Sequence, residues 1–236
     1  MNIDYHSHIL PGIDDGSKSV EQSIEMLKRE ADQGITHVVC TPHFYARHDR
    51  LEDFLARREQ AEQILREEMQ RYTGLPEIHV GAEVRYFRGI SESERINQLT
   101  ILEKKCIMIE MVHAPWQPYM YQELAQIQSR WGITPVIAHV DRYISPLHTF
   151  QIPERLHQLP VMVQANADFF LERRTSGMAV RMLKQRKIHL LGSDCHDLQG
   201  RAPNMKEALS VIEERLGTNA VEYLRRSSYG ALQIDK

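Results

Sequence analysis

The chain has 236 residues, of which 42% are hydrophobic and 26% are charged, and its formal net charge at pH 7 is −3. This length and balance are typical of one globular domain, here residues 1–236, and they exclude a chain that is mainly disordered. The small negative charge gives no support to binding of nucleic acid or of an acidic membrane surface.

Short apolar runs rich in β-branched residues alternate with longer amphipathic segments along the chain. The runs predict seven strands, at residues 2–5, 37–40, 78–81, 107–111, 135–138, 161–165 and 190–193. After the first strand, Val20, Ile24 and Leu27 recur at helical spacing, Ser19 and Gln22 predict a capping box, and Gly34 predicts the helix stop. Further helices are predicted at residues 51–72, 121–131, 153–159, 175–187, 204–216 and 219–226.

This alternation of strands and helices predicts a parallel sheet, because parallel neighbours need a crossover connection. Seven strands can close into a barrel or form an open, doubly wound sheet. No glycine-rich phosphate loop follows any predicted strand, so the sequence does not support a nucleotide-binding fold of that kind.

Side chains of the types that bind metal ions follow six of the seven predicted strands. In a parallel barrel these positions converge on the carboxyl face, however far apart they are in sequence. At a strand end, residues two apart point the same way, so His6 and His8 face one ion, and Asp194 and His196 repeat this spacing. The residues that follow the strands are His6, His8, Asp14, Asp15, His43, Glu83, Glu110, His139, Asp141, Arg142, Asn166, Asp194, His196 and Arg201.

The donor types indicate the metal. Imidazoles and carboxylates without thiolates suit Mn²⁺, Fe²⁺ or Zn²⁺, and the number of groups exceeds what one ion needs, so Glu83 or Glu110 would bridge two ions. By contrast, three histidines near strand starts are expected on the opposite face and are assigned to structure. They are His37, His79 and His189.

Six short motifs give the chain a resemblance to a known family. They are residues 6–16 (HSHILPGIDDG), 40–43 (CTPH), 81–83 (GAE), 109–111 (IEM), 138–143 (AHVDRY) and 193–196 (SDCH). They resemble the motifs of the PHP (polymerase and histidinol phosphatase) superfamily and, within it, the bacterial manganese-dependent tyrosine-protein phosphatases of the capsular polysaccharide type. The resemblance extends from residue 3 to about residue 216.

The resemblance implies a distorted seven-stranded (β/α)7 TIM-like barrel that holds three divalent ions, Mn²⁺ above all. The implied ligands are His6, His8, Glu83 and Asp194 for the first ion, Glu83, Glu110 and His139 for the second, and Asp15, His43 and His196 for the third, with Asp14 as an alternative to Asp15. Arg142 and Arg201 match the family's phosphate-binding arginines. Residues 112–116 (VHAPW) depart from the short proline turn of the family, which bears on substrate preference.

The implied activity is hydrolysis of phosphotyrosine by metal-activated hydroxide. Bound cations can ionise water near pH 7, and two arginine forks match phosphate geometry. A phenol leaving group, with a pKa of about 10, needs little help from a general acid. The implied partner is the phosphorylated C-terminal tail of a bacterial tyrosine kinase that governs capsular or extracellular polysaccharide production.

Other features indicate a cytoplasmic location without membrane insertion. The N-terminal residues lack the pattern of a signal peptide, and no apolar stretch approaches the roughly 20 residues of a membrane span. Cys40, Cys106 and Cys195 are odd in number and provide no disulfide framework, as expected in a reducing compartment.

Three alternatives remain open at this point. Residues 195–201 match the Cys-x5-Arg pattern of cysteine-dependent phosphatases, in which Cys195 would attack phosphorus and Arg201 would bind the phosphate. The chain could instead be a small-molecule phosphatase of the histidinol-phosphatase kind, or a metal-stabilised module that binds phosphopeptides without cleaving them. His113 and Trp116 either line a substrate groove or pack at the surface.

Overall fold

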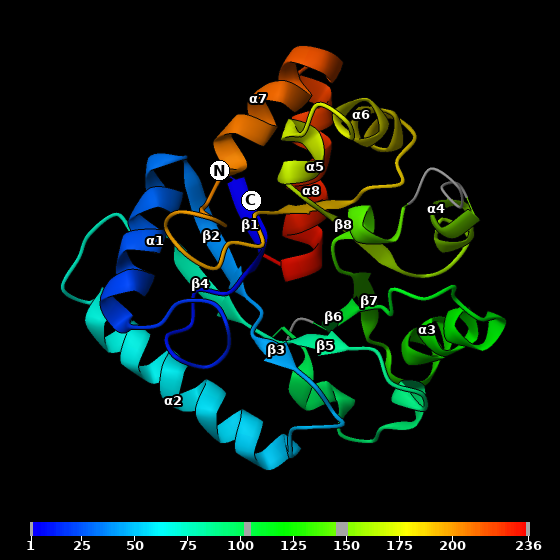
Figure 1. Ribbon diagram of the computed structural model, residues 1–236, viewed down its shortest axis with the longest axis horizontal. Helices are drawn as coiled ribbons and strands as arrows, with labels where there is room; N and C mark the ends of the chain where they lie inside the picture. Colours follow the sequence, from blue (N-terminus) through cyan, green and yellow to red (C-terminus); the bar gives the residue numbers. More distant parts are fainter. Residues whose placement is uncertain (1, 102–104, 145–150, 235–236) are drawn as a thin grey trace.

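The computed structural model describes residues 2–101, 105–144 and 151–234. In these residues nine strands, all paired in parallel, form a curled sheet with the helices around its outside (Figure 1). A three-stranded part has the order β1-β2-β4, and a six-stranded part has the order β3-β5-β6-β7-β8-β9. The strands are β1 Asn2–Ser7, β2 Ile35–Cys40, β3 His43–Phe44, β4 Glu77–Val80, β5 Glu83–Arg85, β6 Cys106–Glu110, β7 Thr134–Ile137, β8 Met162–Asn166 and β9 Leu190–Gly192.

One strand pair in each part of the sheet has the same register. Cys40 of β2 pairs with Val80 of β4, and His43 of β3 pairs with Glu83 of β5, the same offset of 40 residues. The interruption between β2 and β3 contains Pro42, which has no N–H to donate to a neighbouring strand. At the other side of the sheet, a parallel bridge joins Ser7 at the end of β1 to Cys195 after β9, so the two edges of the curled sheet meet.

Helices follow most of the strands and cover the outer surface of the sheet (Figure 1). They are α1 Val20–Asp32, α2 Leu51–Met69, α3 Pro118–Trp131, α4 Gln151–Leu156, α5 Asp168–Leu171, α6 Ser176–Lys184, α7 Met205–Leu216 and α8 Thr218–Leu232, with short 3-10 turns η1 Ile90–Glu92, η2 Ile96–Leu99 and η3 Val140–Tyr143. Among the described residues, none of these helices is long and apolar enough to cross a membrane.

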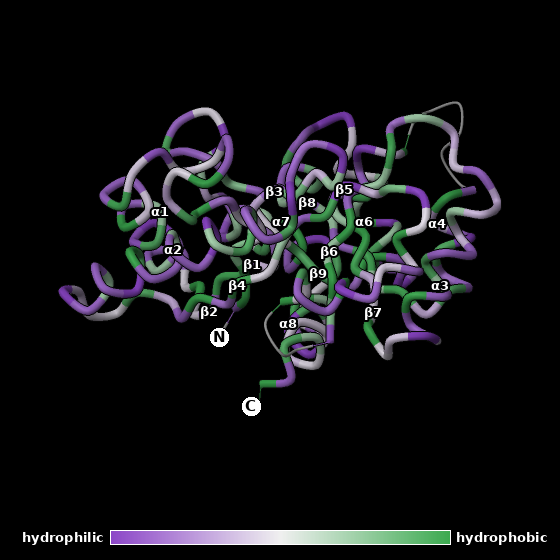
Figure 2. The backbone as a smooth tube through the Cα atoms, turned by 90° about the horizontal axis from the view of Figure 1, so that it is seen from below, coloured by the Kyte–Doolittle hydropathy of each residue, from purple (hydrophilic) through white to green (hydrophobic). Residues whose placement is uncertain are grey.

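Two apolar layers hold this arrangement together. The larger layer lies between the sheet and the surrounding helices. The smaller one fills the inside of the curl with side chains such as Tyr5, Val39 and Met108. Tyr229 and Leu232 of α8 belong to the inner layer, and α8 lies below the strands in Figure 2. The amino ends of the strands are therefore closed by α8, whereas the carboxyl ends are left to polar loops.

The seven predicted strands are all present, and their parallel pairing is confirmed. The open, doubly wound alternative is wrong, because the strands follow one another in chain order and do not reverse at a switch point. Two strands, β3 and β5, were not predicted, nor was α5, and α8 continues six residues beyond its predicted end. Ser19 caps α1 as predicted, but the Gln22 side chain accepts the N–H of Lys18 in place of that of Ser19.

Candidate metal centre

The nine side chains predicted to bind metal ions lie together at the carboxyl ends of the strands. They come from β1, β3, β5 and β6 and from the loops after β1, β7 and β9. Seven of them are buried, while His43 is half-buried and Asp15 is exposed. The nine are His6, His8, Asp15, His43, Glu83, Glu110, His139, Asp194 and His196. Curling of the sheet thus joins residues from both ends of the chain.

Four of these side chains surround one point. His6 Nε2 lies 3.2 Å from His8 Nε2, and each of these nitrogens lies 3.4 to 3.6 Å from Glu83 Oε2 and from Asp194 Oδ1. Ligands about 2.0 to 2.2 Å from a tetrahedral ion are about 3.3 to 3.6 Å from one another. The spacing of the four atoms is therefore that of a cation's first coordination shell.

A second group shares Glu83 with the first. The Oε1 atom of Glu83 lies 2.7 Å from His139 Nε2, which is in turn 3.9 Å from Glu110 Oε1. The two oxygens of Glu83 thus face different groups, Oε2 toward His6 and Oε1 toward His139. A carboxylate in this position has the geometry to bridge two ions.

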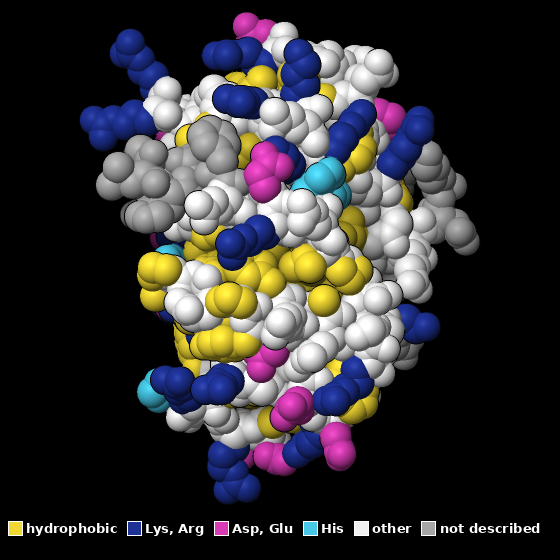
Figure 3. Space-filling model, turned by 90° about the vertical axis from the view of Figure 1, so that its right-hand side faces the viewer, with side chains coloured by type: hydrophobic (Ala, Val, Ile, Leu, Met, Phe, Trp, Pro, Cys, Tyr) yellow, Lys and Arg dark blue, Asp and Glu magenta, His cyan; other side chains and the backbone are white. Residues whose placement is uncertain are grey.

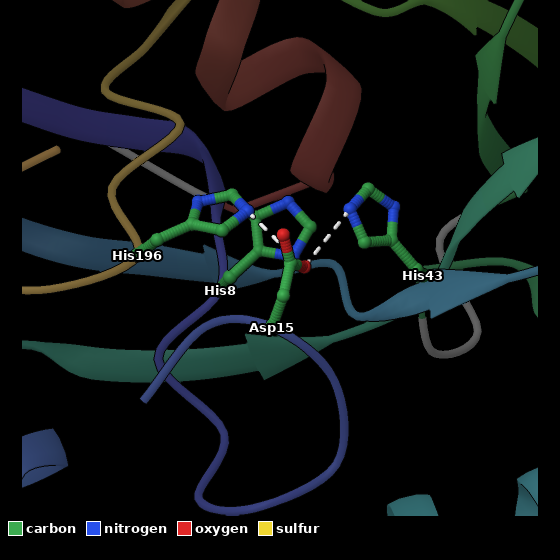
Figure 4. A group of neighbouring side chains, drawn as sticks. All are labelled: His8, Asp15, His43 and His196. Carbon is green, nitrogen blue, oxygen red and sulfur yellow. Dashed lines mark ion pairs between the residues drawn. The ribbon is translucent and has the colours of Figure 1, made fainter. Parts of the chain in front are cut away.

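The third group is drawn in Figure 4. Asp15 reaches back from its loop, and its Oδ1 atom lies 3.3 Å from His43 Nε2 and 3.5 Å from His196 Nε2. Its side chain is 64% exposed, so this group lies nearest to solvent. His8 stands between the first group and this one, with its ring centroid 3.9 Å from that of His196.

The neighbouring Asp14 has a different role. Its Oδ2 atom lies 2.8 Å from His8 Nδ1 and accepts the backbone N–H of His43 at 3.0 Å, while its Oδ1 accepts the N–H of Gly16. A side chain at Gly16 would not fit, since a Cβ there would lie 2.2 Å from the carbonyl oxygen of His8. Asp14 therefore orients His8 and shapes the loop, which leaves Asp15 as the carboxylate that faces the third group.

The electrostatics of the cluster fit divalent cations. Burial acts to raise the pKa of Glu83 and of Asp194, but nearby imidazoles, His6 first among them, outweigh burial and hold the pKa of both carboxyls well below their usual values. Both carboxylates are therefore charged. Within the described residues, the buried His196 Nε2 makes no hydrogen bond, and Glu83 Oε2 lies 2.9 Å from His43 Nδ1 as well as beside the two imidazoles of the first group. A polar atom without a hydrogen bond is costly to bury unless a ligand satisfies it.

Several supporting residues were missed by the sequence analysis. Gln164 of β8 accepts the backbone N–H of His139 through Oε1, which also lies 3.3 Å from His6 Nδ1. The Tyr143 hydroxyl lies 3.3 Å from His139 Nδ1, and Asp4 accepts the N–H of His6 at 3.1 Å. Such outer contacts fix the orientation of ligating imidazoles. Gln164 lies on a predicted strand and precedes Asn166 by two residues, and this spacing could have indicated that both side chains point the same way.

Two of the cluster residues have left-handed backbone conformations. His139 has φ of 31° and Asp194 has φ of 55°, and each lies two residues beyond the end of a strand. Residues other than glycine adopt this conformation at a cost of about 1 to 3 kcal/mol. The contacts that hold them there include the hydrogen bond from Asp194 N–H to the carbonyl oxygen of His6.

Three arginines surround the cluster. Arg142 and Arg201 both donate to Asp194 Oδ2, the latter at 2.7 Å, and their side chains are 33% and 40% exposed. Arg85, which was not predicted, places Nη1 2.8 Å from Glu110 Oε2. It follows Glu83 by two residues on β5, a strand too short to be predicted from the sequence, and therefore lies on the same face of the strand. The rim of the cluster therefore offers guanidinium groups to an anion.

The Cys-x5-Arg alternative does not fit the geometry. Cys195 is fully buried, with Sγ 4.0 Å from Glu30 Oε1, and burial together with Glu30 and Asp4 raises the pKa of its thiol well above the usual value. The loop amides are occupied as well, because the N–H groups of residues 199–201 all donate to Asp197 Oδ1. A phosphate would meet neither a thiolate nor free amides here.

We therefore expect Cys195→Ser to retain the phosphatase activity that the family resemblance implies to within about threefold, since a buried thiol whose pKa is raised takes no part in the chemistry. The measurement is kcat/KM on a phosphotyrosine peptide for the wild type, Cys195→Ser and Cys195→Ala at equal metal content. Loss of more than 100-fold in both folded variants, without loss of metal, would restore the thiolate mechanism.

An apolar pocket adjoins the cluster. It has a volume of about 370 Å³ and is lined by Arg142 and Tyr143, which contact Asp194 and His139 of the cluster. Its other lining residues include Val112, His113, Trp116, Tyr121, Ile152 and Arg155. Trp116 packs on Tyr143 with ring centroids 5.1 Å apart. Figure 3 shows hydrophobic side chains gathered on the face that carries α3 and α4, with Lys and Arg side chains around them. His113 and Trp116 thus line this groove, whereas Tyr119 lies outside the pocket beneath Arg88.

Fold and cluster together define a class of protein, an α/β protein with a curled parallel sheet and a histidine- and carboxylate-lined centre at the carboxyl ends of its strands. Within this class, the chain belongs to the CpsB/CapC family of capsular polysaccharide synthesis, whose family model matches residues 2–231.

Characterised relatives cover nearly the whole chain. The chain is 28% identical over 238 residues to the tyrosine-protein phosphatase CpsB of Streptococcus pneumoniae, covering 94% of each protein. It is 30% identical over 223 residues to the tyrosine-protein phosphatase YwqE of Bacillus subtilis, covering 92% of this chain and 85% of YwqE.

Solved structures share the fold. A structure described with YwqE from Bacillus subtilis and CpsB from Streptococcus pneumoniae as metal-dependent tyrosine phosphatases matches with a TM-score of 0.85 and 24% identity, over 99% of this chain and 95% of the other. A histidinol phosphate phosphatase from Lactococcus lactis, complexed with zinc, L-histidinol and phosphate, matches with a TM-score of 0.60 and 14% identity, over 91% and 94% of the two chains.

Proposed function

We propose that this chain is a metal-dependent protein-tyrosine phosphatase that acts in the production of capsular or extracellular polysaccharide. The observation that carries the proposal is the convergence of nine imidazole and carboxylate groups beside two arginines. The names of the related CpsB and YwqE proteins support the same activity.

In this proposal the centre holds three ions, most favourably Mn²⁺. The first is held by His6, His8, Glu83 and Asp194, the second by Glu83, Glu110 and His139, and the third by Asp15, His43 and His196. The common offset of the β2–β4 and β3–β5 pairs supports a seven-stranded (β/α)7 barrel, in which β3 continues β2 and β5 continues β4. The protein acts in the cytoplasm, on the phosphorylated C-terminal tail of a bacterial tyrosine kinase.

The chain's own residues bind and orient the phosphate. When bound, divalent cations supply positive charge for the phosphate oxygens and a nucleophile derived from water. Arg142 and Arg201, which pair with Asp194 in the free protein, present planar forks that match phosphate oxygens. Asp14 and Gln164 keep the rings of His8 and His6 in place. A phenolate leaving group has a pKa of about 10 and needs little protonation.

The pocket at Trp116 supports an aryl phosphate as substrate. Arg142 and Tyr143 line the pocket and also contact Asp194 and His139 of the cluster, so we expect a phosphate held by Arg142 to direct its ester group into the pocket. Residues 112–116, which depart from the family's proline turn, line this pocket. Their apolar and aromatic side chains suit a tyrosine ring better than a flexible alkyl group.

We expect Trp116→Ala to raise KM for a phosphotyrosine peptide by about 5- to 30-fold, because loss of ring contact costs about 1 to 2 kcal/mol. KM for a small alkyl phosphate should stay unchanged. Tyr119→Ala is the matched control, since Tyr119 lies near Trp116 in sequence but outside the pocket. Equal effects of the two variants on peptide KM would contradict the assignment of the pocket to the substrate ring.

The proposed function as a whole is tested with the purified protein in Mn²⁺, before and after chelation. We expect release of phosphate from a phosphotyrosine peptide, loss of this activity with chelator and its return with Mn²⁺. Faster turnover of alkyl phosphates than of the peptide would favour a small-molecule phosphatase. Tight peptide binding without phosphate release would favour a binding module.

A further inference from the structure

A second cluster of metal-binding side chains lies at the opposite end of the sheet. His37 is on β2, and Glu77 and His79 are on β4. In the parallel ladder His37 pairs directly with Glu77, and His79 pairs with Val39. Because residues two apart on a strand point the same way, His37, Glu77 and His79 share one face of the sheet. Val39, on the same face, belongs to the inner apolar layer.

The three side chains face one another closely. His37 Nδ1 lies 3.1 Å from His79 Nε2 and 3.7 Å from Glu77 Oε2, and His79 Nε2 lies 3.9 Å from Glu77 Oε1. These separations approach those between ligands of one tetrahedral cation, about 3.3 to 3.6 Å. Both histidines were assigned to structure from the sequence, because they lie near strand starts and so on the face opposite the predicted metal centre.

The two imidazoles of this cluster are enclosed by the protein, whereas the carboxylate lies at the surface. The imidazoles of His37 and His79 are only 9% and 11% exposed, whereas Glu77 is 64% exposed and keeps its charge in contact with water. Tyr229 of α8 packs edge-on to His37, with ring centroids 6.3 Å apart, and its buried hydroxyl makes no hydrogen bond within the described residues.

We propose that His37, Glu77 and His79 bind one divalent transition-metal ion, with Zn²⁺ as the best match. Two imidazoles and a carboxylate are a common zinc donor set, and three protein ligands leave a fourth position for water. The site is separate from the nine-residue centre. His37 precedes His43 by six residues along β2 and β3, which is roughly 20 Å at strand rise. Bound metal would join β2 to β4 where α8 closes the inner layer.

The crystallographic test uses the full chain with its centre loaded with Mn²⁺ and then soaked in Zn²⁺. We expect an anomalous peak at the zinc edge between His37, Glu77 and His79. A peak at the nine-residue centre alone would overturn the proposal, because it would leave the two histidines as a hydrogen-bonded pair without a metal.

The solution test compares zinc binding to the Mn²⁺-saturated wild type, His79→Gln and Glu77→Gln by equilibrium dialysis with metal analysis. We expect the remote zinc ion to bind at least about tenfold more weakly in each variant, and zinc to raise the melting temperature of the wild type more than that of either variant. Glu77 is exposed, so Glu77→Gln tests the site even if His79→Gln folds poorly. His157→Gln, an exposed histidine outside both clusters, is the control. Identical zinc binding by all four proteins would overturn the site.

Discussion

Replacing Glu83 with glutamine is expected to lower phosphotyrosine hydrolysis by about 1000-fold or more while the chain remains folded. The two oxygens of Glu83 face two groups of the cluster, 3.5 Å from His6 and 2.7 Å from His139. The amide of glutamine lacks the negative charge by which the Glu83 carboxylate would hold an ion in each of the two groups. Metal-ion catalysis contributes several kcal/mol, and each 1.36 kcal/mol corresponds to a factor of ten in rate.

The measurement combines kcat/KM on a phosphotyrosine peptide with metal analysis of the same preparation. Glu30→Gln is the matched control, since Glu30 is also a buried carboxyl but lies outside the nine-residue cluster, and burial raises its pKa well above the usual value. We expect this variant to keep its metal and to lose less than about tenfold in activity. Wild-type metal content and activity in Glu83→Gln would eliminate the bridging role.

The general location of the cluster could be predicted from sequence because two simple periodicities act together. Parallel strands place their carboxyl ends at one face, and a two-residue repeat points His6 and His8 the same way. Neither inference needs the exact register of the sheet. For that reason the residues that follow the predicted strands meet in one cluster, although His6 and His196 lie near opposite ends of the chain.

The details that could not be predicted depend on register or on loop conformation. Asp14 and Asp15 are equivalent in sequence, and only the turn at Gly16 directs one to His8 and the other to His43. The strands β3 and β5 are two and three residues long, too short for any periodicity to reveal. The meeting of His37 with His79 likewise follows only from the offset between β2 and β4.

Arg142→Ala is expected to lower kcat/KM for a phosphotyrosine peptide by about 10- to 1000-fold, the range for loss of a donor that stabilises charge in a transition state. Arg142 donates to Asp194 of the cluster and also lines the apolar pocket, so its fork contacts both the candidate metal centre and the proposed substrate site. The measurement is steady-state kinetics with metal analysis at saturating metal, because Arg142 contacts the proposed ligand Asp194 and its loss can also weaken metal binding. Arg142→Lys keeps the charge but loses the fork, and we expect it to recover only part of the rate.

Arg201 offers a direct check on this role, because it donates to the same Asp194 oxygen as Arg142. Residues that share a partner are not independent, so the double variant should differ from the product of the two single effects. Arg57→Ala is the control, since Arg57 forms an ion pair with Asp49 at 2.9 Å outside the cluster. If Arg142→Ala matched Arg57→Ala in kcat/KM and in inhibition by inorganic phosphate, Arg142 would be a surface ion pair, and phosphate binding would rest on Arg201 and the bound cations.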